Sequence, residues 1–186
     1  MGFDLIAPED QPRLLALARR ALVARVEGRP APPLETGGAL DVRCGAFVTI
    51  HCRGDLRGCL GRIEPDAPLA LTVADLAASV SDSDPRFEPV ASIELPEIEI
   101  EISVLAPPTE IQSIEEIEVG RHGLVIEQGL RRGLLLPQVA VEHGWDRETF
   151  VVHACRKAAL TPDAWRRGAR IFVFEAYVFG ERLPTG

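Results

Sequence analysis

The pattern of apolar and polar positions predicts two amphipathic helices in the first half of the chain. Residues 10–27 repeat apolar side chains at the helical interval. The members of this stripe are Leu15, Ala18, Leu22 and Val26. A second helix is expected after Asp66, which would cap it, with Pro68 in its first turn. The members of its stripe are Leu69, Val73, Leu76 and Val80.

Strict alternation of apolar and polar residues predicts a strand over residues 97–105, with one buried face and one solvent-exposed face. Its apolar positions are Ile98, Ile100, Ile102 and Val104. A β-hairpin is predicted before it, because strands over 46–52 and 56–63 flank the turn residues Arg53-Gly-Asp55.

Shorter elements are predicted in the second half of the chain. In order, they are a helix over 113–118, strands over 123–128 and 133–136, helices over 137–143 and 146–160, and a strand over 170–179. Asp146 is expected to cap its helix. Because the elements do not alternate strand and helix regularly, an α+β fold is predicted, with a mostly antiparallel sheet flanked by helices.

Length and composition are those of an ordinary globular protein. The chain has 186 residues, of which 46% are hydrophobic and 26% charged. A single domain over residues 1–186 with a sizeable core is therefore predicted. The formal net charge of −8 counts against a general nucleic-acid binder. The net charge does not exclude a local basic site for nucleic acid at the pairs Arg131-Arg132 and Arg166-Arg167.

The expected compartment is the cytoplasm. Met1–Pro8 has no basic segment and no long apolar run, so no signal peptide is predicted. No apolar stretch of the sequence is long enough to span a bilayer, so no membrane association is expected. The four cysteines, Cys44, Cys52, Cys59 and Cys155, are then predicted to be free thiols. Their spacing contains no C-x-x-C, and we expect neither a metal nor a cofactor.

The most unusual segment is Leu56-Arg-Gly-Cys-Leu-Gly61. Residues two apart on a strand point to the same face, so Arg57 and Cys59 are expected side by side. A guanidinium next to a thiol favours the thiolate, and the flanking glycines would let a ligand approach. One interpretation is a reactive thiol with an anion-binding arginine. The alternative is a packed, inert cysteine whose glycine neighbours serve packing.

A second cluster of candidates lies in Asp84-Pro-Arg-Phe87. Asp84 is predicted to orient either Arg86 or Arg57 toward a pocket. The alternative is a structural turn that contains a local ion pair.

Two further polar residues are candidates in the second half of the chain. His122 lies between glycines and would serve as a general base to Cys59 if the fold brought the two together. The alternative is a surface histidine in a turn. Gln138 follows Pro137 at a predicted helix start, where backbone N–H groups attract anions.

These motifs, taken in order, resemble the AmmeMemoRadiSam system protein A family, also called the AMMECR domain. The segment 56–61 is its most distinctive match. The others are Gly45-Ala-Phe-Val48, Asp84-Pro-Arg-Phe87, Glu94-Leu95, Gly120-Arg-His-Gly-Leu124, Gly133-Leu-Leu-Leu-Pro-Gln138, Gly144-Trp-Asp146 and Cys155-Arg-Lys157. The matches run from about residue 13 to residue 179. Leu60 and Ala159 depart from the family's usual isoleucine and glycine but keep an apolar or small residue.

The resemblance implies a two-lobed α+β fold around a sheet. It makes Gln138 a candidate for a binding pocket and centres the candidate site on Cys59 and Arg57. It also implies partnership with a Memo-like protein and a radical S-adenosylmethionine protein. The resemblance does not identify a reaction that the protein would catalyse.

Three functions stay open at this point. The first is an interaction or substrate-delivery module that docks on one of those partners through the Arg57–Cys59 region. The second is a thiol-dependent enzyme or enzyme subunit, with Cys59 as nucleophile and Arg57 binding a small anionic substrate. The third, disfavoured by the acidic net charge, is a nucleic-acid binding module. The oligomeric state does not follow from the sequence.

Overall fold

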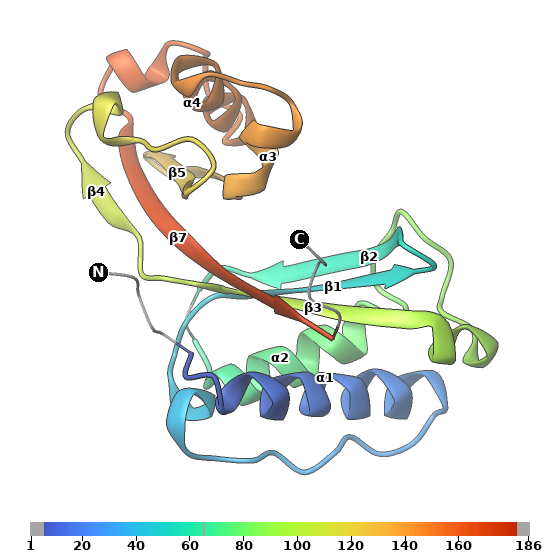
Figure 1. Cartoon of the computed structure of the whole chain (residues 1–186). Coiled ribbons are helices and arrows are strands. Elements are labelled where there is room, and N and C mark those ends of the chain that lie inside the picture. Colours follow the sequence, from blue (N-terminus) through green and yellow to red (C-terminus); the bar gives the residue numbers. More distant parts are fainter. Residues whose placement is uncertain (1–5, 65, 182–186) are drawn as a thin grey trace. The chain divides into compact units, whose positions relative to one another are not determined.

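The computed structural model describes residues 6–64 and 66–181, and the chain divides into two compact units (Figure 1). Unit 1 comprises Met1–Leu105 and Tyr177–Gly186, and unit 2 comprises Ala106–Ala176. Part of the stretch in which no signal peptide is predicted, residues 1–5, lies outside the described residues.

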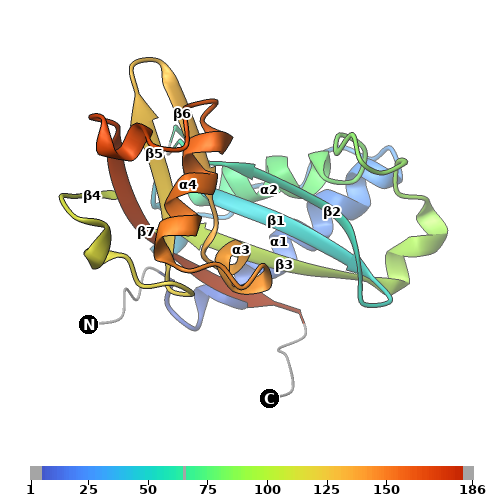
Figure 2. The same ribbon diagram turned by 90° about the horizontal axis from the view of Figure 1, so that it is seen from above.

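Unit 1 is a sheet with two helices on one face. β1 (Ala46–Cys52) lies between β2 (Asp55–Arg62) and β3 (Ile98–Leu105) and is antiparallel to both. α1 (Asp10–Val26) and α2 (Leu69–Ser79) pack against each other and against this sheet (Figure 2). Two short 3-10 helices, η1 (Gly38–Asp41) and η2 (Ser92–Glu97), lie in the connections between these elements. The two helices, the hairpin and the alternating strand predicted from the sequence are thereby confirmed.

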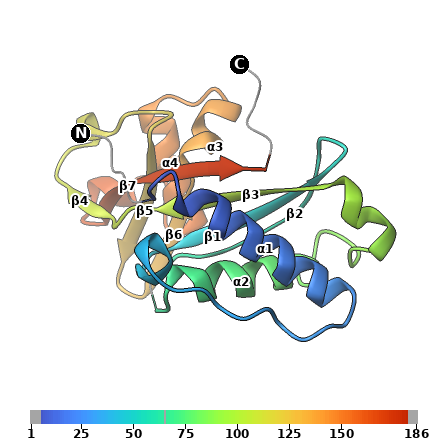
Figure 3. The same ribbon diagram turned by 60° about the horizontal axis from the view of Figure 1, so that its bottom comes forward.

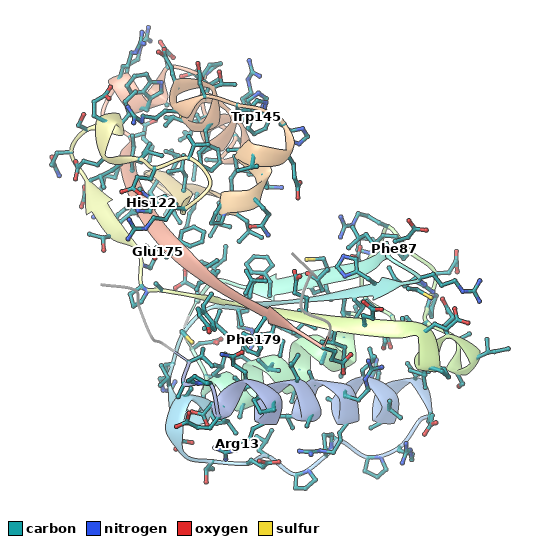
Figure 4. The ribbon with its side chains drawn as sticks, viewed as in Figure 1. Arg13, Phe87, His122, Trp145, Glu175 and Phe179 are labelled. Atoms are coloured by element: carbon teal, nitrogen blue, oxygen red, sulfur yellow. The ribbon has the colours of Figure 1, made fainter. Side chains whose placement is uncertain are left out.

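The core of unit 1 lies between the helices and one face of the sheet. Alternate residues of β1 and β3 point to this side, and they are Ala46, Val48, Ile50, Ile98, Ile100, Ile102 and Val104. The stripe of α1 is rotated from the predicted one, because Leu14 and Leu17 are fully buried while Leu15 and Val26 only border the core. Burying each large side chain of this kind contributes about 1.5–3 kcal/mol. Phe179, labelled in Figure 4, belongs to the same core.

The expected cap of the second helix is wrong. α2 begins at Leu69, and its N-cap residue is Pro68, which has an extended backbone. The reason is that Pro68 forms a β-bridge with Arg43, and the N–H of Leu69 donates to the carbonyl of Val42 at 2.8 Å. Asp66 lies before this bridge, where its carboxylate is 3.6 Å from the guanidinium of Arg62.

Unit 2 is a smaller antiparallel sheet with helices. β5 (His122–Gln128) pairs with β6 (Arg131–Leu135) and with β7 (Arg170–Gly180), whose last residues belong to unit 1. β4 (Thr109–Ile111), which the sequence did not predict, pairs with β7. The helical segments are η3 (Ile114–Glu116), α3 (Pro137–Glu142), α4 (Arg147–Lys157) and η4 (Ala164–Arg166). The core includes Phe150, Val151, Leu124 and Ile126, all fully buried.

Local chemistry explains where the elements of unit 2 begin and end. Asp146 caps α4 as predicted, because its carboxylate accepts a hydrogen bond from the N–H of Thr149 at 2.8 Å. α4 ends at Lys157, earlier than predicted, and Ala159 follows in the left-handed region with φ of 56°. The predicted helix over 113–118 is only the 3-10 turn η3.

The predicted fold class is confirmed. Helices and antiparallel strands occur in both units, and the order is not a regular alternation of strand and helix. Among the helices of residues 6–64 and 66–181, none has the length and apolar character that crossing a membrane requires.

Candidate functional site

A β-bulge in β2 sets the direction of the side chains in the candidate segment. His51 pairs with Leu56, but Ile50 pairs with Gly58, so Arg57 is an extra residue on β2. The bulge interrupts the strict two-residue alternation on which the sequence prediction depended. Arg57 and the residues after Gly58 therefore need not share a face.

The bulge places Cys59 opposite Thr49 on β1. The hydroxyl of Thr49 donates a hydrogen bond to the sulfur of Cys59, with 3.3 Å between Oγ1 and Sγ. The Cys59 side chain is half-buried. Its backbone N–H donates to Oδ2 of Asp84 at 2.9 Å. Cys59 is thus held from two directions, by a neighbouring strand and by the loop after α2.

Asp84 fixes Arg86 beside Cys59. The Arg86 Nε and Nη2 atoms donate to the two carboxylate oxygens of Asp84 at 2.9 and 2.7 Å, and the Arg86 backbone N–H adds a bond of 3.1 Å. The Arg86 guanidinium and the N–H of Cys59 hold the pKa of the Asp84 carboxyl well below its usual range. The Asp84 side chain is 3% exposed and that of Arg86 is 56% exposed, so the pair presents a fixed cation to solvent.

Arg86 also lies within reach of the Cys59 backbone. Its Nη2 atom is 3.5 Å from the carbonyl oxygen of Cys59, at the limit of a hydrogen bond. The guanidinium carbon lies 5.4 Å from the centre of the Phe87 ring, which is labelled in Figure 4. Asp84 therefore pairs with Arg86 and not with Arg57, which also fits the alternative of a structural turn with a local ion pair. Orientation of Arg86 toward a pocket stays a prediction.

Arg57 has a different set of partners. Its Nε and Nη2 atoms donate to the carboxylate of Glu94 at 2.8 and 3.1 Å. Its Nη1 atom donates to the carbonyl of Glu88 at 2.9 Å. This pairing lowers the pKa of Glu94 and raises that of Arg57. Arg57 therefore fastens the segment between α2 and β3 to β2, and the arginine that is held beside Cys59 is Arg86.

Neighbouring groups occupy the space next to Gly58 and Gly61, where a larger residue would place its side chain. A Cβ atom on Gly58 would lie 2.9 Å from a methyl group of Val80. A Cβ atom on Gly61 would overlap the ring of Phe47, its partner on β1. Both glycines thus permit close packing within unit 1.

The cysteines differ in their surroundings. Burial raises the pKa of the Cys44 thiol to about 11 and also raises that of Cys155. Cys52 and Cys59 are half-buried. Within the described part of the chain, no three histidine, cysteine, aspartate or glutamate side chains are grouped to hold a metal ion.

The two remaining candidates belong to unit 2. His122 is the first residue of β5, and its Nδ1 atom accepts a hydrogen bond from the N–H of Glu118 at 3.1 Å. It thereby stabilises a local turn. Gln138 is the second residue of α3, which has only six residues. The site described here is therefore built from residues of unit 1: Thr49, Cys59, Asp84 and Arg86.

The two arginine pairs of unit 2 are engaged in local contacts. Arg131 donates to the carbonyl of Ala159 at 2.8 Å, and Arg132 lies 3.1 Å from Glu127. Arg166 and Arg167 form ion pairs with Glu148 and Asp163. Nucleic-acid binding through them stays a prediction.

Sequence reasoning did not find Thr49, and it named Glu94 only as part of the family match Glu94-Leu95, with no role. A regular hairpin with the two-residue turn Arg53-Gly54 would pair Thr49 with Gly58, and only the bulge pairs it with Cys59. The Glu94 carboxylate also accepts a hydrogen bond from the N–H of Ala91 at 2.7 Å, but the sequence carried no capping signal there, because alanine has no side-chain oxygen.

The AMMECR1 family model matches residues 15–179. Protein MK0488 of Methanopyrus kandleri is 43% identical, and the match covers 100% of this chain and 95% of that protein. Protein MJ0810 of Methanocaldococcus jannaschii is 46% identical over 76% of this chain and 75% of its own length. The crystal structure of the uncharacterized protein PH0010 from Pyrococcus horikoshii superimposes with a TM-score of 0.86, at 38% identity, over 98% of this chain and 96% of that one.

Proposed function

The chain belongs to the AMMECR1 family, and from that premise we propose that it is an interaction or substrate-delivery module. Its recognition surface is the cluster of Thr49, Cys59, Asp84 and Arg86, which we name the Cys59–Arg86 cluster. Its partners are a Memo-like protein and a radical S-adenosylmethionine protein, in the cytoplasm.

The observation that carries this proposal is the fixed orientation of Arg86. Arginine is enriched among the residues that dominate interface energies, because one side chain combines charge, five donors and a flat apolar surface. A flexible arginine loses side-chain entropy when it binds. The bidentate bond to the buried Asp84 has already imposed that cost in the free protein.

The composition of the cluster favours a partner that presents an acidic group. The outward guanidinium edge of Arg86 offers donors, and the Thr49 hydroxyl and Cys59 thiol lie on the adjoining strand pair. A carboxylate on a partner surface would match the guanidinium in charge and in geometry.

A direct test is to measure binding to the purified Memo-like and radical S-adenosylmethionine proteins of the same organism by biolayer interferometry. Alkylation of Cys59 is then followed peptide by peptide, with and without the partner. We expect saturable binding that slows alkylation of Cys59 and leaves Cys52, which is also half-buried, unchanged. Absence of binding to both proteins at every salt concentration would refute the proposal.

A second candidate function is favoured by one contact. The hydrogen bond from the Thr49 hydroxyl holds the Cys59 sulfur in a fixed position, as a thiol-dependent enzyme acting on a small anionic substrate would need for its nucleophile. In that case Arg86, rather than Arg57, would bind the anion. Rapid alkylation of Cys59 at neutral pH, compared with Cys52, and its slowing in Thr49→Val would support this function. Equal rates for the two cysteines would exclude it.

A further inference from the structure

A groove in unit 1, away from the Cys59–Arg86 cluster, is lined by cations and apolar groups. The segment after α1 runs back along the helix toward η1 (Figure 3). Between the helix and this segment lies a groove of about 410 Å³. That volume is within the range of about 300–1,000 Å³ that small-molecule sites occupy.

Three arginines line the groove. Arg19 and Arg20 contribute to it from α1, and Arg29 contributes from the returning segment. Each of these arginines pairs with a carboxylate, but none of those carboxylates lines the groove. The groove therefore presents guanidinium N–H donors whose charge is balanced by carboxylates outside it.

The arginines differ in the number of donors that stay available. Arg19 already uses four of its five N–H donors, in bonds to the Glu181 carboxylate and to the carbonyls of Leu95 and Ile98. Arg20 and Arg29 have side chains that are 45% and 59% exposed, and each forms an ion pair with one carboxylate. Their remaining N–H groups are available to a ligand.

The rest of the lining is apolar and stiff. Val23 and Ala24 belong to α1, and Pro30 and Pro32 to the returning segment. The proline rings fix the backbone of that segment and offer flat apolar surface. A ligand with an apolar body would cover these apolar side chains and remove them from water. A bare ion would leave the same side chains exposed to water.

The groove is fastened at both ends. Next to the helix end, the N–H of Arg29 donates to the carbonyl of Ala24 at 2.7 Å. Farther along, Arg13 donates to the carbonyl of Thr36 at 2.9 Å, and Arg20 donates to Glu35 at 2.8 Å. Arg13 is labelled in Figure 4. The groove is thus preformed, which reduces the entropy lost on binding.

We propose that this groove binds a small organic anion: a phosphate monoester whose oxygens accept hydrogen bonds from Arg20 and Arg29 and whose apolar body lies against Val23 and the two prolines. Guanidinium groups match phosphate oxygens bidentately. This site is independent of the Cys59–Arg86 cluster.

The probe for a test is phenyl phosphate, added to the full chain and followed by calorimetry and by the NMR signals of the Val23 methyl groups. We expect saturable binding with a Kd of about 1 mM or tighter. Arg20→Ala combined with Arg29→Ala should weaken it by about tenfold or more. The control is Arg166→Ala combined with Arg167→Ala, an exposed and ion-paired arginine pair of unit 2, which should leave the Kd unchanged.

The same titration with inorganic phosphate separates the two halves of the proposal. Weaker binding of inorganic phosphate than of phenyl phosphate supports the apolar contribution. Lack of saturation with phenyl phosphate, or equal weakening by both double variants, would overturn the site. Circular dichroism shows that each variant is folded before it is titrated.

Discussion

The backbone N–H of Cys59 donates a 2.9 Å hydrogen bond to the carboxylate of Asp84, which lies 25 residues later in the chain. This bond ties the middle of β2 to the loop that follows α2. The same carboxylate holds Arg86 through two further bonds from its guanidinium. One buried acid thus joins the candidate thiol to the candidate cation.

The first prediction concerns the contribution of Asp84 to stability. Asp84→Asn should lower the free energy of unfolding by about 1–3 kcal/mol at neutral pH, because an amide cannot accept all of the hydrogen bonds that the carboxylate accepts. Since the pKa of this carboxyl is lowered by folding, its contribution is present above about pH 4, the range of an unfolded aspartate, and is lost as the pH falls further.

Urea unfolding of both proteins over a series of pH values checks this prediction. The difference between wild type and Asp84→Asn should shrink as the pH is lowered below about 4. A difference that stays constant down to strongly acidic pH would mean that the charge of Asp84 does not contribute.

The second prediction concerns the contact between Gly61 and Phe47. Gly61→Ala should destabilise the protein by about 1–3 kcal/mol, because the added methyl group would overlap the ring that lies over this glycine. Phe47→Leu in the same chain should recover part of that loss. A double-mutant cycle by thermal unfolding measures the coupling, and additive effects of the two substitutions would show that the ring and the glycine are not in contact.

The third prediction concerns the order in which the cysteines react. Burial raises the pKa of Cys44 to about 11 and raises that of Cys155, so both should stay unmodified by iodoacetamide in the folded protein near neutral pH. Cys52 and Cys59, which are half-buried, should be modified first. Mass spectrometry of the digested protein reports each site, and early modification of Cys44 would contradict the burial described for unit 1.

Much of the fold could be predicted from the sequence, because local periodicity reports directly on buried faces. The alternation from Ile98 to Val104 predicted β3 within one residue of its start. Asp146 predicted the start of α4, since capping depends on a side chain and a backbone group that are close in sequence. The start of α2 was missed because a long-range bridge between Arg43 and Pro68 sets it, and periodicity contains no information on such pairing.

The candidate site was predicted only in part. Cys59, Asp84 and Arg86 were identified, but the partner of Cys59 was expected to be Arg57. That expectation depended on regular alternation, and the bulge at Arg57 removes the regularity. The ion pair between Arg57 and Glu94 spans 37 residues, so no local rule reveals it. His122 and Gln138 have local contacts or positions in unit 2, and their roles stay predictions.

The account predicts that the exposed edge of Arg86 is the principal contact to a partner, and binding to the Memo-like protein tests this most directly. Arg86→Ala should weaken binding by at least about tenfold, equivalent to about 1.4 kcal/mol, and Arg86→Lys should restore part of it. The matched control is Arg166→Ala, because Arg166 is 58% exposed and also ion-paired, to Glu148. Loss of binding in Arg86→Ala alone, with folding intact, is the predicted result. Unchanged affinity in Arg86→Ala, or the same loss in Arg166→Ala, would contradict the assignment of the Cys59–Arg86 cluster as the recognition surface.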